Sequence, residues 1–329
     1  MESDQLTELI LALQMIKGVG PKTVLKFFET VKPQMILDNF QNMHRNTIIN
    51  KRINEGVLDY QEWKLLLEKA RHLIEKSRKL GIQVLNYQDD AYPANLRSLN
   101  HYPLVIYVKG NLEALQGPSV GFIGTRRPTE LGYKMAERMA YQFAKDGLTV
   151  VSGLSIGTNT AAHRGALNAG GTTVAILGES LEQPIYPKEN VDLAQEILNN
   201  GGAIMSTYSL GAIVRRQFLA ARDEWESGLA DGLVVVETDQ NGKTESALQH
   251  AFKQGRPVGM LDHSQCPKIN DIMQIEQAIG NQEFIRKRRA KPLWNIESLH
   301  EFEKTMAKSR IEFLNKSKRH KRLAEIRLF

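Results

Sequence analysis

A glycine turn with two arginines, Gly124-Thr125-Arg126-Arg127, directly follows the apolar run 120–123. A strand that ends in such a turn and opens a helix brings backbone N–H groups, a helix N-terminus and guanidinium groups to one point. Pro128 favours a helix that starts immediately after the turn. We therefore predict that this turn binds a phosphate or another anion and that Arg126 contacts it directly. The alternative is a strand-to-helix turn whose arginines are only solvated.

Two more glycine turns follow apolar runs of the same kind, in residues 150–157 (VVSGLSIG) and 174–178 (VAILG). The carboxyl ends of neighbouring parallel strands meet at one edge of a sheet, where open α/β sheets bind their ligands. We therefore expect the three turns to form one continuous anion-binding rim. Gly153 and Gly157 would let the backbone approach a ligand closely. His163 is expected to be structural or ligand-adjacent rather than catalytic, because no partner carboxylate is assignable.

Two further segments are candidate anion contacts. Residues 186–190 (YPKEN) offer Lys188 to a phosphate, and the alternative is a rigid loop before a helix. Residues 242–247 (GKTESA) place Lys243 and Thr244 at a glycine turn that would enter a helix. This segment is not a Walker A motif, because it lacks the first glycine at the required spacing. Its alternative is an ordinary capped helix start.

Near the N-terminus, residues 16–22 (IKGVGPK) follow one amphipathic stretch and precede another. A hydrophobic residue, Gly-x-Gly and a new helix outline a helix-hairpin-helix unit, whose turn amides can face a nucleic-acid phosphate. Gly18 and Gly20 would form the turn, and Lys22 would add positive charge. A hairpin that serves only in packing fits the residues equally well.

The elements that must position these turns follow from the spacing of apolar residues. Residues 1–80 are predicted to form a helical domain, because apolar residues recur at helical spacing in 6–16 and 63–74. In 81–285 short apolar runs alternate with amphipathic stretches, which indicates a doubly wound, mainly parallel α/β sheet. Residues 286–329 are predicted to form a basic C-terminal arm, either a helix or partly ordered. The predicted strands are 82–87, 104–108, 120–123, 148–151, 173–177, 203–205, 233–237 and 257–261.

Composition narrows the class of protein. The 329-residue chain contains one cysteine, which excludes an internal disulfide and a cysteine-based metal cluster. No apolar run approaches the roughly 20 residues that span a bilayer, so we expect a cytoplasmic protein without membrane contact. The net charge of +6 is uneven: residues 286–329 carry fourteen Lys and Arg against five Asp and Glu. The isoelectric point is therefore weak evidence that the main domain binds nucleic acid.

Taken together, the motifs resemble the DprA/Smf family of bacterial DNA-processing proteins over about 170 residues, from Tyr87 to Val258. The resemblance implies an extended Rossmann-like domain behind an N-terminal helical domain of the SAM or helix-hairpin-helix kind. It also implies sequence-independent binding of single-stranded DNA, a homodimer, delivery of the strand to the RecA recombinase, and neither catalysis nor a cofactor. The segments that carry it are 92–96 (YPANL), 124–127 (GTRR), 152–154 (SGL), 161–167 (AAHRGAL), 174–178 (VAILG), 186–190 (YPKEN) and 255–258 (GRPV).

The chain also departs from the family pattern. Of the usual Phe-Pro-x-Arg-Asn-Arg segment Arg222 remains, and it is expected to contact the DNA backbone. Asp223 and Glu224 follow it and place negative charge where phosphates would lie. These changes leave two alternatives open. One is a regulator or antitoxin of a phage-defence module with its own protein partner, and the other is a nucleotide-binding sensor.

Overall fold

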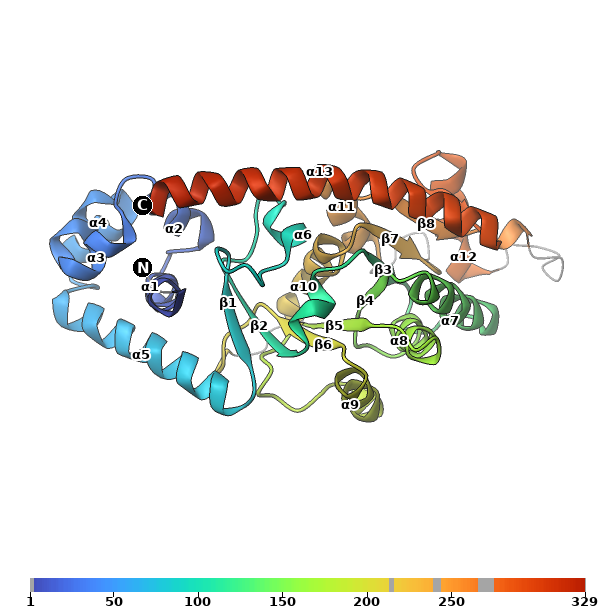
Figure 1. Ribbon diagram of the computed structural model, residues 1–329, viewed down its shortest axis with the longest axis horizontal. Helices are drawn as coiled ribbons and strands as arrows, with labels where there is room; N and C mark the ends of the chain where they lie inside the picture. The colour runs from blue at the N-terminus through green and yellow to red at the C-terminus, as the bar shows by residue number, and fades with distance from the viewer. Residues whose placement is uncertain (1–2, 213–215, 239–243, 266–274, 329) are drawn as a thin grey trace.

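The computed structural model describes residues 3–212, 216–238, 244–265 and 275–328 (Figure 1). Within these residues, nine strands form one sheet in the order β1-β2-β6-β5-β4-β3-β7-β8-β9. All eight predicted strands are present, and the predicted α/β class is confirmed. The strands are β1 (Gln83–Asn86), β2 (Val105–Gly110), β3 (Ser119–Ile123), β4 (Thr149–Gly153), β5 (Thr173–Leu177), β6 (Ala203–Ser206), β7 (Gly232–Val235), β8 (Val258–Leu261) and β9 (Lys291–Leu293).

The seven strands from β6 to β9 in this order pair in parallel, whereas the β1–β2 and β2–β6 pairs are antiparallel. The order of the strands reverses at β3, because β4 to β6 continue on one side of it and β7 to β9 on the other. Such a reversal opens a crevice at the carboxyl ends of the two central strands, here β3 and β7. The predicted turn after 120–123 therefore flanks this crevice.

The edge strand β9 was not predicted, and it corrects the boundary placed at residue 285. Residues 291–293 pair in parallel with β8, so the sheet extends into the segment that we assigned to the basic arm. Three residues are too few to show an alternating pattern. Pro292 also lowers strand propensity, but an edge strand tolerates it because its missing N–H is not needed there.

Helices cover both faces of the sheet. The side chain of Val150 packs in a cluster with α7 (Glu130–Lys145) and α8 (Thr158–Asn168), whereas its neighbour Val151 belongs to the cluster on the opposite face. The remaining elements of this part are α6 (Ala94–Arg97), α9 (Val191–Asn199), α10 (Arg216–Leu229), α11 (Thr244–Gln254), α12 (Glu276–Arg286) and the short 3₁₀ turns η2 (Leu112–Leu115), η3 (Lys188–Asn190) and η4 (His263–Gln265).

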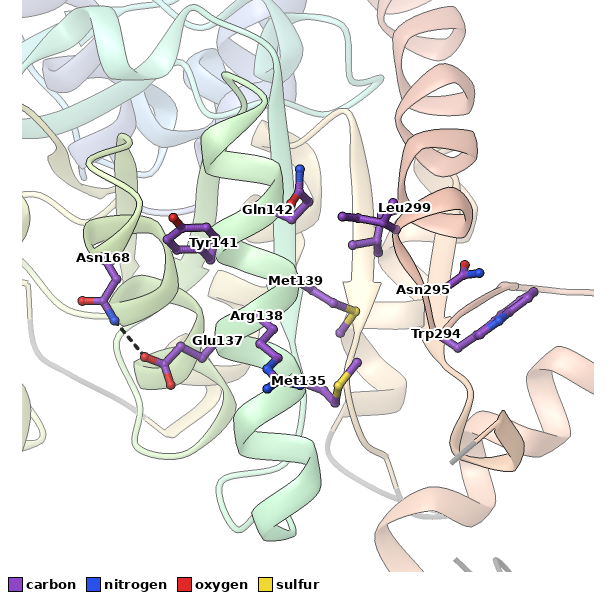
Figure 2. A pocket seen from close by; sticks show the side chains of 11 residues that line it. Met135, Glu137, Arg138, Met139, Tyr141, Gln142, Asn168, Trp294, Asn295 and Leu299 are labelled. Carbon is purple, nitrogen blue, oxygen red and sulfur yellow. Dashed lines mark hydrogen bonds between the residues drawn. The ribbon is translucent and has the colours of Figure 1, made fainter. Parts of the chain in front are cut away.

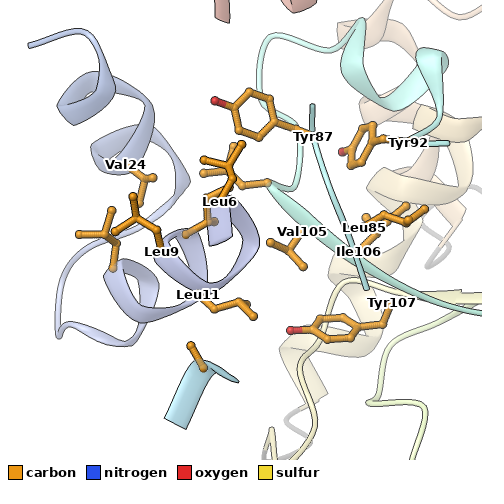
Figure 3. Packing of buried hydrophobic residues seen from close by; sticks show 14 of the residues in the cluster. Leu6, Leu9, Leu11, Val24, Leu85, Tyr87, Tyr92, Val105, Ile106 and Tyr107 are labelled. Atoms are coloured by element: carbon orange, nitrogen blue, oxygen red, sulfur yellow. The ribbon is translucent and has the colours of Figure 1, made fainter. Parts of the chain in front are cut away.

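The N-terminal helices share a core with the sheet. Leu6, Leu9 and Leu11 of α1 are buried in one cluster with Val105 and Tyr107 of β2 (Figure 3). The helical part is thus packed onto the antiparallel edge of the sheet. Its elements are α1 (Ser3–Met15), α2 (Pro21–Phe28), α3 (Pro33–Asp38), η1 (Phe40–Arg45), α4 (Thr47–Asn54) and α5 (Tyr60–Lys79).

Residues 296–328 of the predicted arm form one long helix, α13 (Ile296–Leu328), which crosses the molecule and ends beside the N-terminal helices (Figure 1). Phe302 is fully buried against the sheet cluster. Phe313 packs its ring 3.6 Å from the buried Arg256 guanidinium, and Arg310 Nη1 lies 3.1 Å from Asp231 Oδ2. No described helix is both long and apolar enough to span a membrane.

If α13 is held by its buried face, Phe302→Ala should lower the free energy of unfolding by about 3–5 kcal/mol, because it empties a closed core site. Ile311→Ala on the exposed side of the same helix, where Ile311 is 62% exposed, should change it by less than about 0.5 kcal/mol. Urea denaturation of both variants checks this. Equal losses would show that α13 is not anchored by this face.

Candidate nucleic-acid interface

The turn after β3 is held by backbone contacts on two sides. The Thr125 N–H donates to the carbonyl of Glu237 after β7 (3.0 Å), and the Thr125 carbonyl accepts from the Thr158 hydroxyl at the start of α8 (3.0 Å). A Cβ atom at Gly124 would lie 2.5 Å from that hydroxyl oxygen. Gly124 and Thr125 therefore set the shape of the turn. Arg126 is exposed to solvent.

The N-terminus of α7 does not offer the anion seat that we predicted after this turn. The Thr129 hydroxyl caps the helix by accepting from the Gly132 N–H (2.9 Å). The fully buried Glu237 carboxyl accepts from the Thr129 N–H (2.8 Å) and from the Thr129 hydroxyl (2.6 Å). Glu237 thus supplies the negative group that a helix N-terminus favours. The prediction of a free helix end was wrong, and the exposed arginine side chains are what this turn presents.

The turn after β4 packs against the first turn. Gly157 has φ +82° and precedes α8, and a Cβ atom there would lie 2.5 Å from the Arg126 carbonyl oxygen. A Cβ atom at Gly153 would lie 2.5 Å from Glu226 Oε1 and 2.9 Å from Arg222 Cζ. Both glycines therefore permit close approach of other protein groups. This brings the β3 turn, the start of α8 and the side chains of α10 together.

Helix α10 adds a guanidinium and two carboxyl groups to this edge. Arg222 Nε lies 3.1 Å from Glu226 Oε1 and 4.0 Å from Asp223 Oδ1. Arg222 is 9% exposed and Glu226 is 2% exposed. Neither Arg222 Nε nor Glu226 Oε1 has a well-aligned hydrogen-bond partner among the described residues. Buried polar atoms are seldom left in this state without a ligand or water to satisfy them.

Burial shifts the titration of these carboxyl groups. It raises the pKa of Glu226 to about 8, although the neighbouring Arg222 opposes the shift. Burial also raises the pKa of Asp223, and Arg222 and Arg126 both oppose that shift. The pKa of Glu179, after β5, is raised by burial and lowered in part by Arg222. Burial therefore favours the protonated form of Glu226, and this form leaves the charge of Arg222 less compensated.

Lys188 belongs to a loop that packs near the start of α8. It opens η3 and is exposed. Asn190, two residues later, donates to the Leu154 carbonyl (3.0 Å) and to the Thr160 hydroxyl (2.9 Å), so this loop packs on the β4–α8 turn. Arg126 and Lys188 thus belong to loops that pack against the same turn, one following β3 and the other following β5.

The positions of the remaining predicted site residues differ from one another. Thr244 is the first residue of α11, and Lys243 lies outside the described residues. Exposed Arg127 donates its N–H to the Thr125 hydroxyl (3.1 Å). Glu224 lines a separate groove beside α1 and α2. The prediction that Asp223 and Glu224 together oppose phosphate binding is thus corrected to Asp223, with buried Glu226 as the second acid.

The predicted helix-hairpin-helix turn connects α1 and α2. Gly18 has φ +86°, Gly20 is the N-cap of α2, and Lys22 is exposed. Arg52 of α4 donates from Nε to the Lys17 carbonyl (2.9 Å). This hydrogen bond holds the turn against α4. Arg52 was not predicted, because no local pattern connects α4 to this turn.

His163 is fully buried within α8, with Nε2 2.7 Å from the Gly153 carbonyl oxygen and Nδ1 2.7 Å from the Thr173 hydroxyl oxygen. Burial lowers its pKa to about 4, so the ring is neutral and donates from Nε2 to the carbonyl. His163 therefore holds the β4 turn in place, which is a structural role.

Glu226 and Glu179 are the site residues that sequence reasoning missed. The i, i+4 spacing of Arg222 and Glu226 was a usable signal, since residues so spaced on a helix are neighbours. Glu179 follows a predicted turn, but only the tertiary structure brings it near α10.

Ionisation of Glu226 should weaken anion binding at this edge. As the pH rises through about 8, a carboxylate forms 3.1 Å from Arg222 Nε and competes with a bound phosphate. We expect affinity for an oligo(dT) strand to fall between pH 7 and 9 at constant ionic strength, and Glu226→Gln to remove most of that fall. Fluorescence anisotropy measures both. Glu312→Gln, at an exposed position of α13, should retain the wild-type profile, and identical profiles for the two variants would contradict this role.

The reversal of strand order at β3, with cationic side chains on loops at the carboxyl edge, defines a Rossmann-like α/β protein. The family model of DNA recombination-mediator protein A matches residues 83–304. The chain belongs to this family, the DprA/Smf proteins, as the sequence predicted.

Individual relatives agree with this assignment. The chain is 33% identical to the DNA processing protein DprA of Streptococcus pneumoniae over 183 residues, which are 56% of this chain and 64% of the relative. The X-ray structure of that DprA superposes with a TM-score of 0.68 at 24% identity, over 91% of this chain and 97% of the other. DprA from Helicobacter pylori, whose structure describes a single-stranded DNA binding mode, superposes with a TM-score of 0.57 at 27% identity, over 69% and 96%.

Proposed function

We propose that this protein binds the phosphate backbone of single-stranded DNA at the carboxyl edge of its sheet and acts in DNA uptake and recombination. The observation that carries the proposal is the convergence of Arg126, Arg222 and the Lys188 loop around the first turn of α8. Membership of the recombination-mediator family and the DNA-binding H. pylori relative support it.

Binding would be independent of base sequence. Arg126 and Lys188 are exposed cations on loops, and such groups contact phosphates rather than base edges. Arg222 is less accessible, and its charge is shared with Asp223 and Glu226. We infer that Arg126 and Lys188 provide most of the attraction and that Arg222 adds a contact whose strength follows the protonation of its neighbours. The role is binding rather than catalysis.

Arg126→Ala should lower affinity for oligo(dT) about tenfold at low salt, because a charge-assisted contact to phosphate is lost. It should also reduce the slope of log affinity against log salt by about 0.7, the value for one phosphate on a single strand. Lys188→Ala should act in the same direction. Anisotropy titrations across a salt series measure both quantities.

Arg319→Ala is the matched control, because Arg319 is an exposed arginine of α13 that belongs to none of the proposed sites. It should leave affinity and slope near the wild-type values. Binding that is absent at low salt in the wild type, or equal losses in Arg126→Ala and Arg319→Ala, would overturn the proposed site.

We propose further that the chain forms a homodimer in the cytoplasm and passes the strand to a RecA recombinase. An apolar groove of about 740 Å³ between α7 and the start of α13 supports the dimer (Figure 2). Met135 and Met139 line one wall and Trp294 the other, and Trp294 is 42% exposed. In a two-fold dimer one patch meets its own copy, so the protruding ring of one protomer would enter the groove of its partner.

Trp294→Asp should therefore shift the protein from dimer to monomer, because a carboxylate would be buried in an apolar contact. Light scattering coupled to size-exclusion chromatography measures the mass. Ile311→Asp, at an exposed position of α13 outside the groove, is the control and should remain dimeric. A monomeric wild type would contradict the dimer, and a dimeric Trp294→Asp would contradict this interface.

A further inference from the structure

A second groove, distinct from the edge that holds Arg126, lies between the α1–α2 hairpin and the face made by β2 and α10. Its volume is about 670 Å³. Gly20, Pro21 and Lys22 line it on the hairpin side, and Tyr107 and Trp225 line it on the sheet side. The groove thus combines a helix N-terminus with an aromatic wall.

The hairpin side is suited to a phosphate group. Helix α2 has eight residues, its N-cap Gly20 makes no side-chain cap hydrogen bond, and Pro21 at its first turn has no N–H. The N–H groups of Lys22 and Thr23 belong to the first turn and have no intrahelical acceptor. Lys22 is exposed and adds a positive charge at the same point. A phosphate would satisfy both the dipole and the free donors.

The aromatic side contains a buried hydroxyl group that has only a poorly aligned partner. Tyr107 is 2% exposed, and its hydroxyl has no well-aligned hydrogen-bond partner among the described residues, although Ser209 lies beside it. Figure 3 shows this hydroxyl directed away from β2 toward the side of α1 where Leu11 lies. Since burying a hydroxyl with only a poorly aligned partner is unfavourable, this atom points to a ligand that supplies a polar edge.

We propose that this groove holds one nucleotide of a single-stranded nucleic acid. The base lies against the ring of Trp225 with its polar edge toward the Tyr107 hydroxyl, and a phosphate binds Lys22 and the N-terminus of α2. Aromatic stacking accepts any base, so this contact adds affinity without sequence preference. Glu224 of α10 is the one carboxylate among the described residues that line the groove. Its negative charge repels a phosphate from the α10 side, so the phosphate lies at the hairpin end.

The proposal rests on the proposed function, because it assumes a strand that also contacts the edge at Arg126. It goes beyond that function by giving the helical domain its own nucleotide site. A strand bound at both places would be held by both domains at once. Dissociation would then require release from two contacts, which raises overall affinity without strengthening either one.

Two signals recorded in one titration test the proposal. Anisotropy of fluorescein-labelled oligo(dT) reports total binding, and emission of Trp225 reports occupancy of the groove. The Trp225 signal is the difference between wild type and Trp225→Phe, which removes the contributions of Trp63 and Trp294. We expect oligo(dT) to quench Trp225 in the wild type. Lys22→Glu should abolish the quenching and weaken total binding about tenfold.

Lys26→Glu is the matched control, because Lys26 is exposed on the same helix but does not line the groove. It should retain the quenching. Strong anisotropy binding with unchanged Trp225 emission in the wild type would overturn the groove and leave the proposed function intact. Absence of any anisotropy change would overturn both. A change in Trp225 emission that depends on protein concentration in the absence of oligo(dT) would place a second copy of the chain in the groove. That result would likewise overturn the proposal.

Discussion

The buried carboxyl group of Glu237 connects the elements that form the carboxyl edge of the sheet. It stands just past the end of β7, at the reversal of strand order, and accepts two hydrogen bonds from Thr129 at the start of α7. The N–H of Thr125 donates to its backbone carbonyl, and His263 Nε2 lies 3.0 Å from its side chain. A Cβ atom at Gly132 would lie 2.3 Å from the carboxyl carbon, so the helix accommodates this group only through a glycine.

This arrangement changes how the crevice of a Rossmann-like sheet is used. In many such folds a ligand phosphate binds at the first helix N-terminus. Here the protein's own carboxyl group takes that position, and the cationic groups lie to the side, around α8. A long polymer of phosphates suits such a surface better than one buried phosphate does, because its charges can be contacted one at a time along the edge.

The acids beside Arg222 introduce a second constraint. An arginine next to two carboxyl groups would ordinarily be neutralised, and the surface would lose attraction for phosphate. Burial works in the opposite direction, since it favours the protonated form of Glu226 and Asp223. The balance between charge pairing and desolvation therefore decides how much of the positive charge of Arg222 remains available to attract a phosphate.

The N-terminal helical domain and α13 extend the molecule beyond the sheet and are attached to each other and to its antiparallel edge. Helix α1 packs on β1 and β2, and α13 reaches back from β9 to the N-terminal helices. His320 Nδ1 lies 2.7 Å from the Arg97 carbonyl oxygen, and His320 stacks on Tyr102, so the far half of α13 is attached to the segment between β1 and β2. The hairpin groove depends on this packing, because its two walls come from different domains.

The sequence by itself determined the α/β class, the eight strands from 82 to 261 and the family, because apolar periodicity and glycine turns are local properties of the chain. It also singled out Arg126, whose exposure after a turn is locally encoded. Only the tertiary structure decided that Glu237 fills the end of α7, that Glu226 and Glu179 approach Arg222, and that β9 extends the sheet. These outcomes join residues from distant parts of the chain, and burial, which sets the charge of Glu226, exists only once those parts are packed.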